Sequence, residues 1–213
     1  MARLFIGLSL PDSVAEPLAR LVQGALAEPQ FRIYPARDLH VTLCFLGEHP
    51  NPTQVARALG DETRGLFAPE LRLAGVGAFP SLEDPRALWA GVEEEEDSFG
   101  RLDALRNRAR NAALGAGWRM PASERARPFR PHVTVARPRV SRERMSGEVG
   151  APRPPAGVDS GGGARAAIPA AFLGLRPRGS FLVPTACLYD SDPGRPEERY
   201  RVLAETPLAV RPG

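Results

Sequence analysis

The sequence contains no lysine, and all 28 of its basic residues are arginine. This absence excludes reactions that need a lysine side chain, such as Schiff-base formation, phosphate binding by a P-loop lysine and ligation through a lysyl-nucleotide intermediate. Arginine itself suits phosphate, because its planar guanidinium presents a fork of donors to phosphate oxygens. The net charge of +3 is too small to require a long nucleic acid as partner.

Cysteine and long apolar runs are also scarce. Cys44 and Cys187 are the only cysteines, and each lies in an apolar run typical of a strand. We expect reduced thiols in the core of a cytoplasmic protein, with a buried disulfide as the alternative. No stretch reaches the roughly 20 apolar residues of a membrane helix, so we expect no membrane partner. Residues 3–10 lead directly into Pro11 without a small-residue cleavage site, which favours a buried strand over a signal peptide.

Helical and strand patterns alternate along the chain. Apolar spacing predicts helices over 12–25 and about 53–66, the second capped by Thr53, and the acidic run 93–97 predicts the start of a third. Strand patterns occupy 39–46, 71–79, 87–92, 132–137, 180–189 and 199–203, with the last two forming a hairpin across 190–194. The alternation predicts an α+β fold. Residues 147–166 are rich in glycine and proline and predict a flexible surface insertion.

Two of the three histidines lie in a repeated motif. The sequence reads His40-Val41-Thr42-Leu43 and, 92 residues later, His132-Val133-Thr134-Val135, although the chain has only six threonines. In a strand, residues two apart point to the same face, so each motif offers an imidazole and a hydroxyl side by side. The repeat hints at two related lobes. A single His-x-Thr would be read as ordinary strand packing, but the repetition indicates a shared site.

Two histidines and two hydroxyls suit acid–base chemistry at a phosphodiester. A neutral imidazole can take a proton from water while a protonated one gives a proton to the leaving group. The hydroxyls of Thr42 and Thr134 can donate to oxygens that gain charge in the transition state. Metal binding is a weaker interpretation, since no cysteine or carboxylate stands at ligand spacing around His40 or His132. We expect no metal and no other cofactor.

The motifs and their flanks resemble the 2H phosphoesterase superfamily, specifically the bacterial and archaeal RNA 2′,3′-cyclic phosphodiesterases, whose signature is the HxTx motif. The similarity extends over nearly the whole chain. It is carried by segments 3–11, 38–48, 129–137, 188–191 and 200–203. The resemblance implies two βαββ-like lobes with facing antiparallel sheets around a central cleft and helices outside. It implies one two-lobed domain over 1–213.

The activity that the resemblance implies is metal-independent hydrolysis of a 2′,3′-cyclic phosphate, on RNA ends or nucleotides, to a 2′-phosphomonoester. It assigns catalysis to His40 and His132 and phosphate hydrogen bonding to Thr42 and Thr134. We expect His132 to activate water and His40 to protonate the 3′-oxygen. The protein is expected to act as a monomer.

Three further residues are predicted to bind substrate. The resemblance implies that Arg137 contacts phosphate and Phe45 stacks on the base. Each lies an odd number of residues from its histidine, however, and should face away unless the strand ends or bulges. Arg130, two residues before His132, shares its face by period alone.

Two other functions stay open. A protein of this kind can bind nucleotides or RNA ends without turnover, although the two histidines argue against that here. The second alternative is joining of RNA ends through a 2′–5′ linkage, which needs no lysine.

Overall fold

A computed structural model describes residues 2–26, 30–49, 51–126, 128–139, 167–192 and 199–211. The predicted Gly/Pro-rich insertion at 147–166 lies outside the described residues. The strands are β1 (Ala2–Ser9), β2 (Phe31–Ile33), β3 (His40–His49), β4 (Glu70–Pro80), β5 (Pro85–Glu94), β6 (His132–Pro138), β7 (Ser180–Leu182), β8 (Thr185–Ser191) and β9 (Tyr200–Pro207). The helices are α1 (Asp12–Ala25), α2 (Pro52–Thr63), α3 (Arg101–Gly115), α4 (Ala122–Ala126) and α5 (Ala170–Leu173), with short 3₁₀ turns η1 (Ala36–Asp38) and η2 (Glu96–Ser98).

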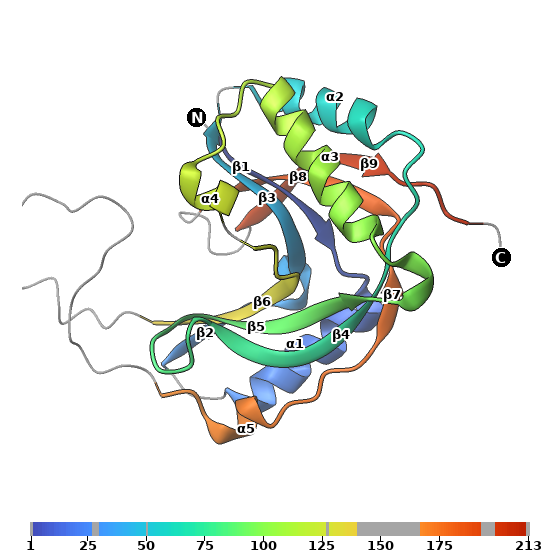
Figure 1. Cartoon of the computed structure of the whole chain (residues 1–213). Helices are drawn as coiled ribbons and strands as arrows, with labels where there is room; N and C mark the ends of the chain where they lie inside the picture. The colour runs from blue at the N-terminus through green and yellow to red at the C-terminus, as the bar shows by residue number, and fades with distance from the viewer. Residues whose placement is uncertain are drawn as a thin grey trace, which may run out of the picture.

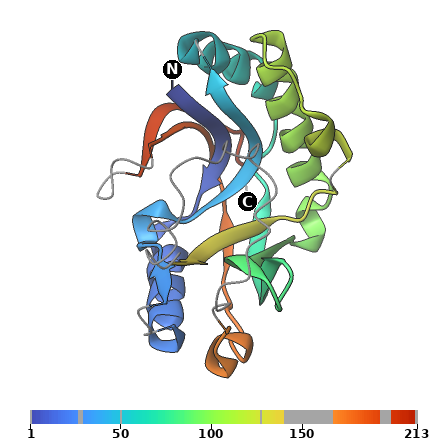
Figure 2. The ribbon, with the colours of Figure 1, turned by 90° about the vertical axis from the view of Figure 1, so that its left-hand side faces the viewer.

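The described strands form one antiparallel sheet in the order β7-β4-β5-β6-β3-β1-β8-β9. Strand β2 pairs with the C-terminal end of β6, residues 136–138. Figures 1 and 2 show this sheet curled on itself, with helices on its outer side. Helices α2 and α3 cover the lobe built from β3, β1, β8 and β9, whereas α1 and α5 lie beside the lobe built from β4 to β7 (Figure 1). The predicted α+β class with two antiparallel lobes is confirmed, and β3 and β6 join the lobes.

The helices form where apolar residues recur every three or four positions. In α3, Leu102, Leu105, Ala109 and Ala112 are buried on one face. Asn51, and not the predicted Thr53, caps α2, because its side chain accepts a hydrogen bond from the backbone N–H of Gln54 at 3.1 Å. Among the described residues, no helix has the length and hydropathy that a membrane crossing requires.

The acidic run is not a helix start, because β5 continues through Glu94 and α3 begins at Arg101. The carboxylate of Glu94 reaches forward instead and accepts hydrogen bonds from the backbone N–H groups of Gly100 (2.9 Å) and Leu102 (2.6 Å). The run still satisfies the N-terminus of α3, but from the neighbouring strand.

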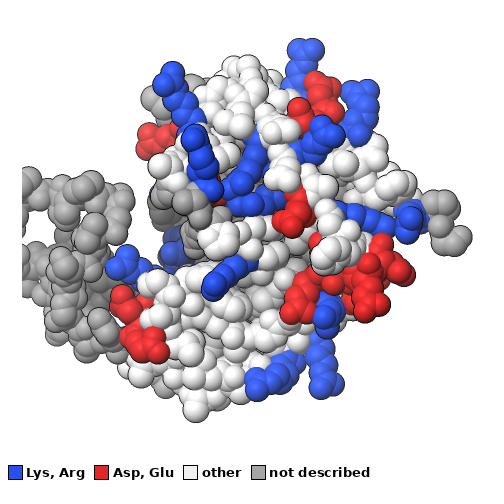
Figure 3. Space-filling view, in the orientation of Figure 1, with Lys and Arg blue, Asp and Glu red and all other residues white. Residues whose placement is uncertain are grey.

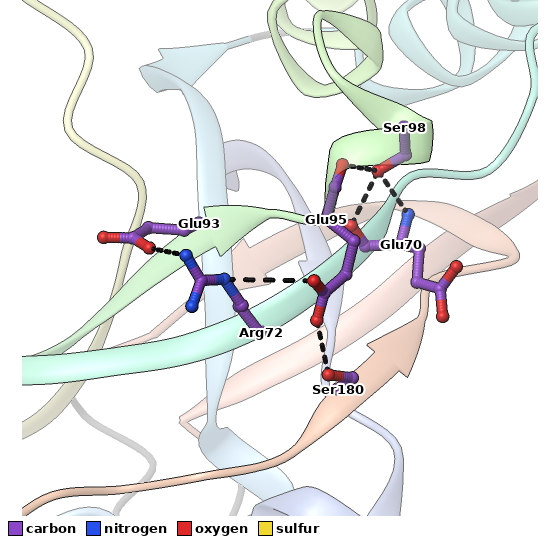
Figure 4. A network of polar contacts seen from close by, with 6 residues as sticks. All are labelled: Glu70, Arg72, Glu93, Glu95, Ser98 and Ser180. Atoms are coloured by element: carbon purple, nitrogen blue, oxygen red, sulfur yellow. Dashed lines mark hydrogen bonds and ion pairs between the residues drawn. The ribbon is translucent and has the colours of Figure 1, made fainter.

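A polar network ties the edge of the second lobe together (Figure 4). Arg72 of β4 pairs with Glu93 of β5 and with Glu95, whose carboxylate also accepts a hydrogen bond from Ser180 of β7. The buried hydroxyl of Ser98 donates to the carbonyl of Glu70 at 2.7 Å. In Figure 3 a group of acidic side chains lies on the right of the view, and arginine side chains are spread over the rest of the face.

The predicted strand 180–189 is two strands, because Val183 and Pro184 interrupt it. Strand β7 pairs with β4 of one lobe, and β8 pairs with β1 of the other. The hairpin of β8 with β9 is confirmed, with Thr185 opposite Pro207 and Ser191 opposite Tyr200. Cys44 and Cys187 are both buried free thiols.

Candidate active site

The two His-x-Thr motifs meet where the lobes join. Val41 of β3 pairs with Val133 of β6 in antiparallel register, and both valines are fully buried. Continued by one residue in each direction, this register sets His40 across from Thr134 and His132 across from Thr42. Because side chains alternate along a strand, these four polar side chains share the face opposite the valines.

A β-bulge follows the threonine of the first motif. The register of β3 with β1 shifts between Thr42 and Cys44, so Leu43 is an extra residue. Leu43 and Cys44 are accordingly both buried although they are adjacent. The bulge reverses the alternation and brings Phe45, which is 42% exposed, back to the face of His40.

A β-bulge also follows the threonine of the second motif. The register of β6 with β5 shifts between Thr134 and Ala136, so Val135 is the extra residue, and Val135 and Ala136 are both buried. Arg137, five residues after His132, thereby returns to the active face. Strict alternation predicts that Phe45 and Arg137 face away, and the two bulges explain why they do not.

Both histidines are held in the same way. Nδ1 of His40 lies 2.7 Å from the carbonyl oxygen of Asp38, and Nδ1 of His132 lies 2.7 Å from that of Arg130. A carbonyl oxygen can only accept a hydrogen bond, so each Nδ1 must carry the proton. In the neutral ring Nε2 is then the basic nitrogen, and in the protonated ring it is a donor. Nδ1 therefore orients each imidazole, and Nε2 is the nitrogen at which each ring can exchange a proton with a ligand.

A pocket of about 430 Å³ opens beside the first motif. It contains five of the seven residues predicted from the sequence, namely His40, Thr42, Phe45, Thr134 and Arg137. It extends from His40 over β1, β8 and β9, and its remaining lining residues are Arg3, Phe5, Tyr34, Asp38, Ser191, Arg199 and Tyr200. The lining contains three arginines (Arg3, Arg137 and Arg199) and one aspartate (Asp38), so the pocket favours an anionic ligand.

The remaining two predicted residues are not among the described residues that line this pocket. His132 lies in ring contact with Phe79 (4.9 Å between centroids) and Trp89 (6.4 Å). The side chain of Arg130 is exposed, and only its carbonyl oxygen engages His132. Strand alternation does not extend to Arg130, because β6 begins at His132.

Aromatic rings enclose His40. The ring of Phe5 lies 4.7 Å from the imidazole centroid, and that of Tyr200 lies 4.8 Å away, edge-on. This burial lowers the pKa of His40 to about 4, the hydrogen bond to the carbonyl of Asp38 opposes the shift, and the charge of His132 adds to it. His40 is therefore neutral at pH 7 in the unliganded protein.

The lining residues that sequence reasoning missed come from β1, the end of β8, the start of β9 with the residue before it, and the segment before the first motif. Arg3 lies 5.2 Å from the centroid of the Phe45 ring, in cation–π geometry. Arg3, Ser191 and Tyr200 belong to segments that carry the family resemblance, which was the available signal. Tyr34 and Arg199 had none. Among the described residues, no three His, Cys, Asp or Glu side chains are placed to hold a metal ion.

The protein-family model described as the 2′–5′ RNA ligase superfamily matches residues 10–148 of this chain. The chain belongs to this superfamily. The 2H phosphoesterase resemblance is thereby confirmed, and proteins named RNA 2′,3′-cyclic phosphodiesterase are among its relatives. The one from Archaeoglobus fulgidus is 32% identical over 136 residues, which cover 63% of this chain and 72% of the relative. The one from Geobacillus stearothermophilus is 30% identical over 212 residues, covering 98% of this chain but 58% of the relative.

Solved structures of the superfamily share the fold. The crystal structure of TT0787 of Thermus thermophilus has a TM-score of 0.65 and 26% identity and covers 97% of both chains. Escherichia coli LigT complexed with 3′-AMP has a TM-score of 0.65 and 24% identity and covers 98% of both chains.

Proposed function

We propose that the protein hydrolyses 2′,3′-cyclic phosphates at RNA or nucleotide ends to 2′-phosphomonoesters. The observation that carries the proposal is the arrangement of two His-x-Thr motifs across the Val41–Val133 pair, with Nδ1 of each histidine held by a backbone carbonyl. It agrees with the activity named for the relatives from Archaeoglobus fulgidus and Geobacillus stearothermophilus.

The position of the pocket supports an assignment of the two histidines. The pocket is lined by His40 and by residues of β1, β8 and β9, whereas His132 is not among its lining residues. In an in-line displacement the leaving 3′-oxygen stays on the nucleoside side, and the attacking water comes from the opposite side. This position supports His40 as the acid for the 3′-oxygen and His132 as the base for water, the assignment expected above.

Protons and bonds balance in this reaction. The water oxygen forms a bond to phosphorus while His132 Nε2 takes its proton, the bond from phosphorus to the 3′-oxygen breaks, and His40 Nε2–H protonates that oxygen. Thr42 and Thr134 donate hydrogen bonds to the phosphate oxygens, Arg137 contributes charge, and Phe45 stacks on the base. The product is a 2′-phosphate with a free 3′-hydroxyl, and both histidines exchange protons with solvent before the next cycle.

The low pKa of His40 belongs to the empty pocket. A bound phosphate anion close to His40 raises the pKa of the imidazole, because a nearby opposite charge favours the charged form. Substrate binding thus brings the proton that the reaction uses onto His40.

We also propose that residues 1–213 form a single two-lobed domain that acts as a monomer in the cytoplasm, without metal. One continuous sheet and one pocket lined from both lobes support this organisation.

The test is turnover of a short RNA ending in a 2′,3′-cyclic phosphate, in the presence of EDTA. We expect a 2′-phosphate end with the natural protein, and a rate about 10²–10⁴-fold lower with His40→Ala or His132→Ala. Binding without turnover, joining of RNA ends as the only reaction, or loss of activity in EDTA would contradict the proposal.

A further inference from the structure

Tyr34 is a buried phenol that faces the pocket. It follows β2, and its backbone N–H donates to the carbonyl of Val135, the bulge residue of β6, at 2.9 Å. Only 4% of the residue is exposed, yet it lines the pocket together with His40 and Arg137. The bulge that turns Arg137 toward the pocket therefore also fixes the place of Tyr34.

The hydroxyl of Tyr34 already takes part in two hydrogen bonds. Arg32 Nη2 donates to it at 3.0 Å. The hydroxyl of Tyr200 is its second partner, and either hydroxyl can donate in that bond. Arg32 can only donate, so when Tyr200 also donates, the proton of Tyr34 is the hydrogen-bonding group that it offers to a ligand.

The surroundings of Tyr34 are cationic. The guanidinium of Arg32 lies 5.2 Å from the ring centroid and that of Arg199 5.9 Å. Burial raises the pKa of Tyr34, but the charge of Arg137 and the hydrogen bonds with Arg32 and Tyr200 outweigh it, and the pKa lies below its ordinary value. A phenol polarised in this way is a strong donor, and an anion is the acceptor that these arginines attract.

We propose that Tyr34 donates its hydroxyl proton to a phosphate oxygen of the bound substrate. It is a third hydroxyl donor beside Thr42 and Thr134, held in position by Arg32 and Tyr200. The inference rests on the proposed function, because it takes the ligand of the pocket to be a nucleotide phosphate. It adds to that function a contact to phosphate, not to the base or ribose.

Tyr34→Phe removes the hydroxyl and keeps the ring. We expect kcat/KM for adenosine 2′,3′-cyclic phosphate to fall about 10- to 100-fold, the range for a hydrogen bond to a charged group. The Kd of adenosine 2′-monophosphate should weaken by a similar factor, while the Kd of adenosine stays the same. A merely structural role would move both Kd values together or neither.

Tyr189→Phe is the matched control. Tyr189 is also buried, at 5% exposed, and stacks on Phe5 at 4.6 Å, but it does not line the pocket. Tyr189→Phe should therefore change the Kd of adenosine 2′-monophosphate and kcat/KM by less than about twofold from the values of the natural protein.

A second measurement needs no variant. The chain has three tyrosines, so ¹³Cζ-labelled tyrosine gives three NMR signals. The Tyr34 signal should shift when adenosine 2′-monophosphate is added, and adenosine alone should not reproduce the shift. An unshifted Tyr34 signal, or a Tyr34→Phe protein that binds adenosine 2′-monophosphate as the natural protein does, overturns the inference. If the natural protein binds this nucleotide through Tyr34 but turns over no cyclic phosphate, the proposed function fails and the Tyr34 contact stands.

Discussion

Val41 and Val133 form the backbone pair that joins the two lobes, and the candidate active site is centred on it. The antiparallel register runs each motif against the other, so that each histidine has a threonine from the opposite strand as its neighbour. Both histidines hold their Nδ1 against the carbonyl two residues before them. Both motifs are followed by a bulge that turns a later residue, Phe45 or Arg137, back to the face of the histidines. The site is thus built from two copies of one local device, whereas the pocket beside it is not repeated.

A substrate with a better leaving group separates the roles of the histidines. A nucleoside 2′,3′-cyclic phosphate with sulfur in place of the bridging 3′-oxygen releases a thiolate, which needs no proton. His40→Ala should recover most of its lost rate on this substrate, and His132→Ala should not, because water still has to be activated. Single-turnover rates on the oxygen and sulfur substrates give the comparison. Recovery by His132→Ala alone would mean that the two roles are exchanged.

The threonine hydroxyls should act mainly in the transition state. Thr42→Val and Thr134→Val keep the branched shape and remove the donor. We expect kcat to fall about 10- to 10³-fold while KM changes little. Thr→Ser at each position is the control, since it restores the hydroxyl and should recover most of the rate. A rise in KM at constant kcat would show that the hydroxyls only bind the ground state.

The exposed ring of Phe45 should contribute binding and not chemistry. Phe45→Ala is expected to raise KM about 5- to 100-fold, as for loss of one base–aromatic stack, at an unchanged kcat. Phe67→Ala is a suitable control, because Phe67 is similarly exposed (45%) and lies outside the pocket lining. Equal effects of the two substitutions on KM would refute the stacking role.

Burial of His40 has a consequence for stability. Its pKa is about 4 in the folded protein against an ordinary value of 6.5, so between these pH values the unfolded chain binds a proton that the folded chain does not. The free energy of unfolding should therefore fall as the pH is lowered through this window, by at most about 3 kcal/mol from this group.

Urea unfolding of the natural protein and of His40→Asn, at about pH 7.5 and about pH 4.5, measures this term. The variant has no imidazole at position 40 that takes up a proton on unfolding. Its free energy of unfolding should therefore fall less on acidification than that of the natural protein. Parallel losses in the two proteins would show that His40 titrates normally in the folded state.

The sequence predicts the strands and helices where pattern and turn signals agree. The histidine motifs are the strongest case, because a repeat of His-x-Thr in two strand patterns places both side chains on one face without knowledge of the fold. The predictions that depend on strict alternation fail at the bulges. Neither Leu43 nor Val135 differs in kind from its neighbours, so the extra residue is visible only in the pairing with β1 and β5.

Other differences have tertiary causes. The short β2 lies in a segment that reads as a loop, and it is a strand because it pairs with the end of β6. The carboxylate of Glu94 caps α3 from a strand, a contact that local sequence does not contain. The places of Tyr34 and Arg199 in the pocket wall depend on tertiary contacts, Tyr34 on its hydrogen bond to Val135 of β6 and Arg199 on the pairing of β9 with β8, which no local motif signals.

The central claim is tested most directly by following adenosine 2′,3′-cyclic phosphate with ³¹P NMR in ¹⁸O-labelled water and EDTA. We predict that the cyclic phosphate signal is replaced by that of adenosine 2′-monophosphate carrying one ¹⁸O atom, and that His40→Ala and His132→Ala each slow the conversion at least about 100-fold. A 3′-monophosphate product, or conversion at the natural rate in both histidine variants, would contradict it.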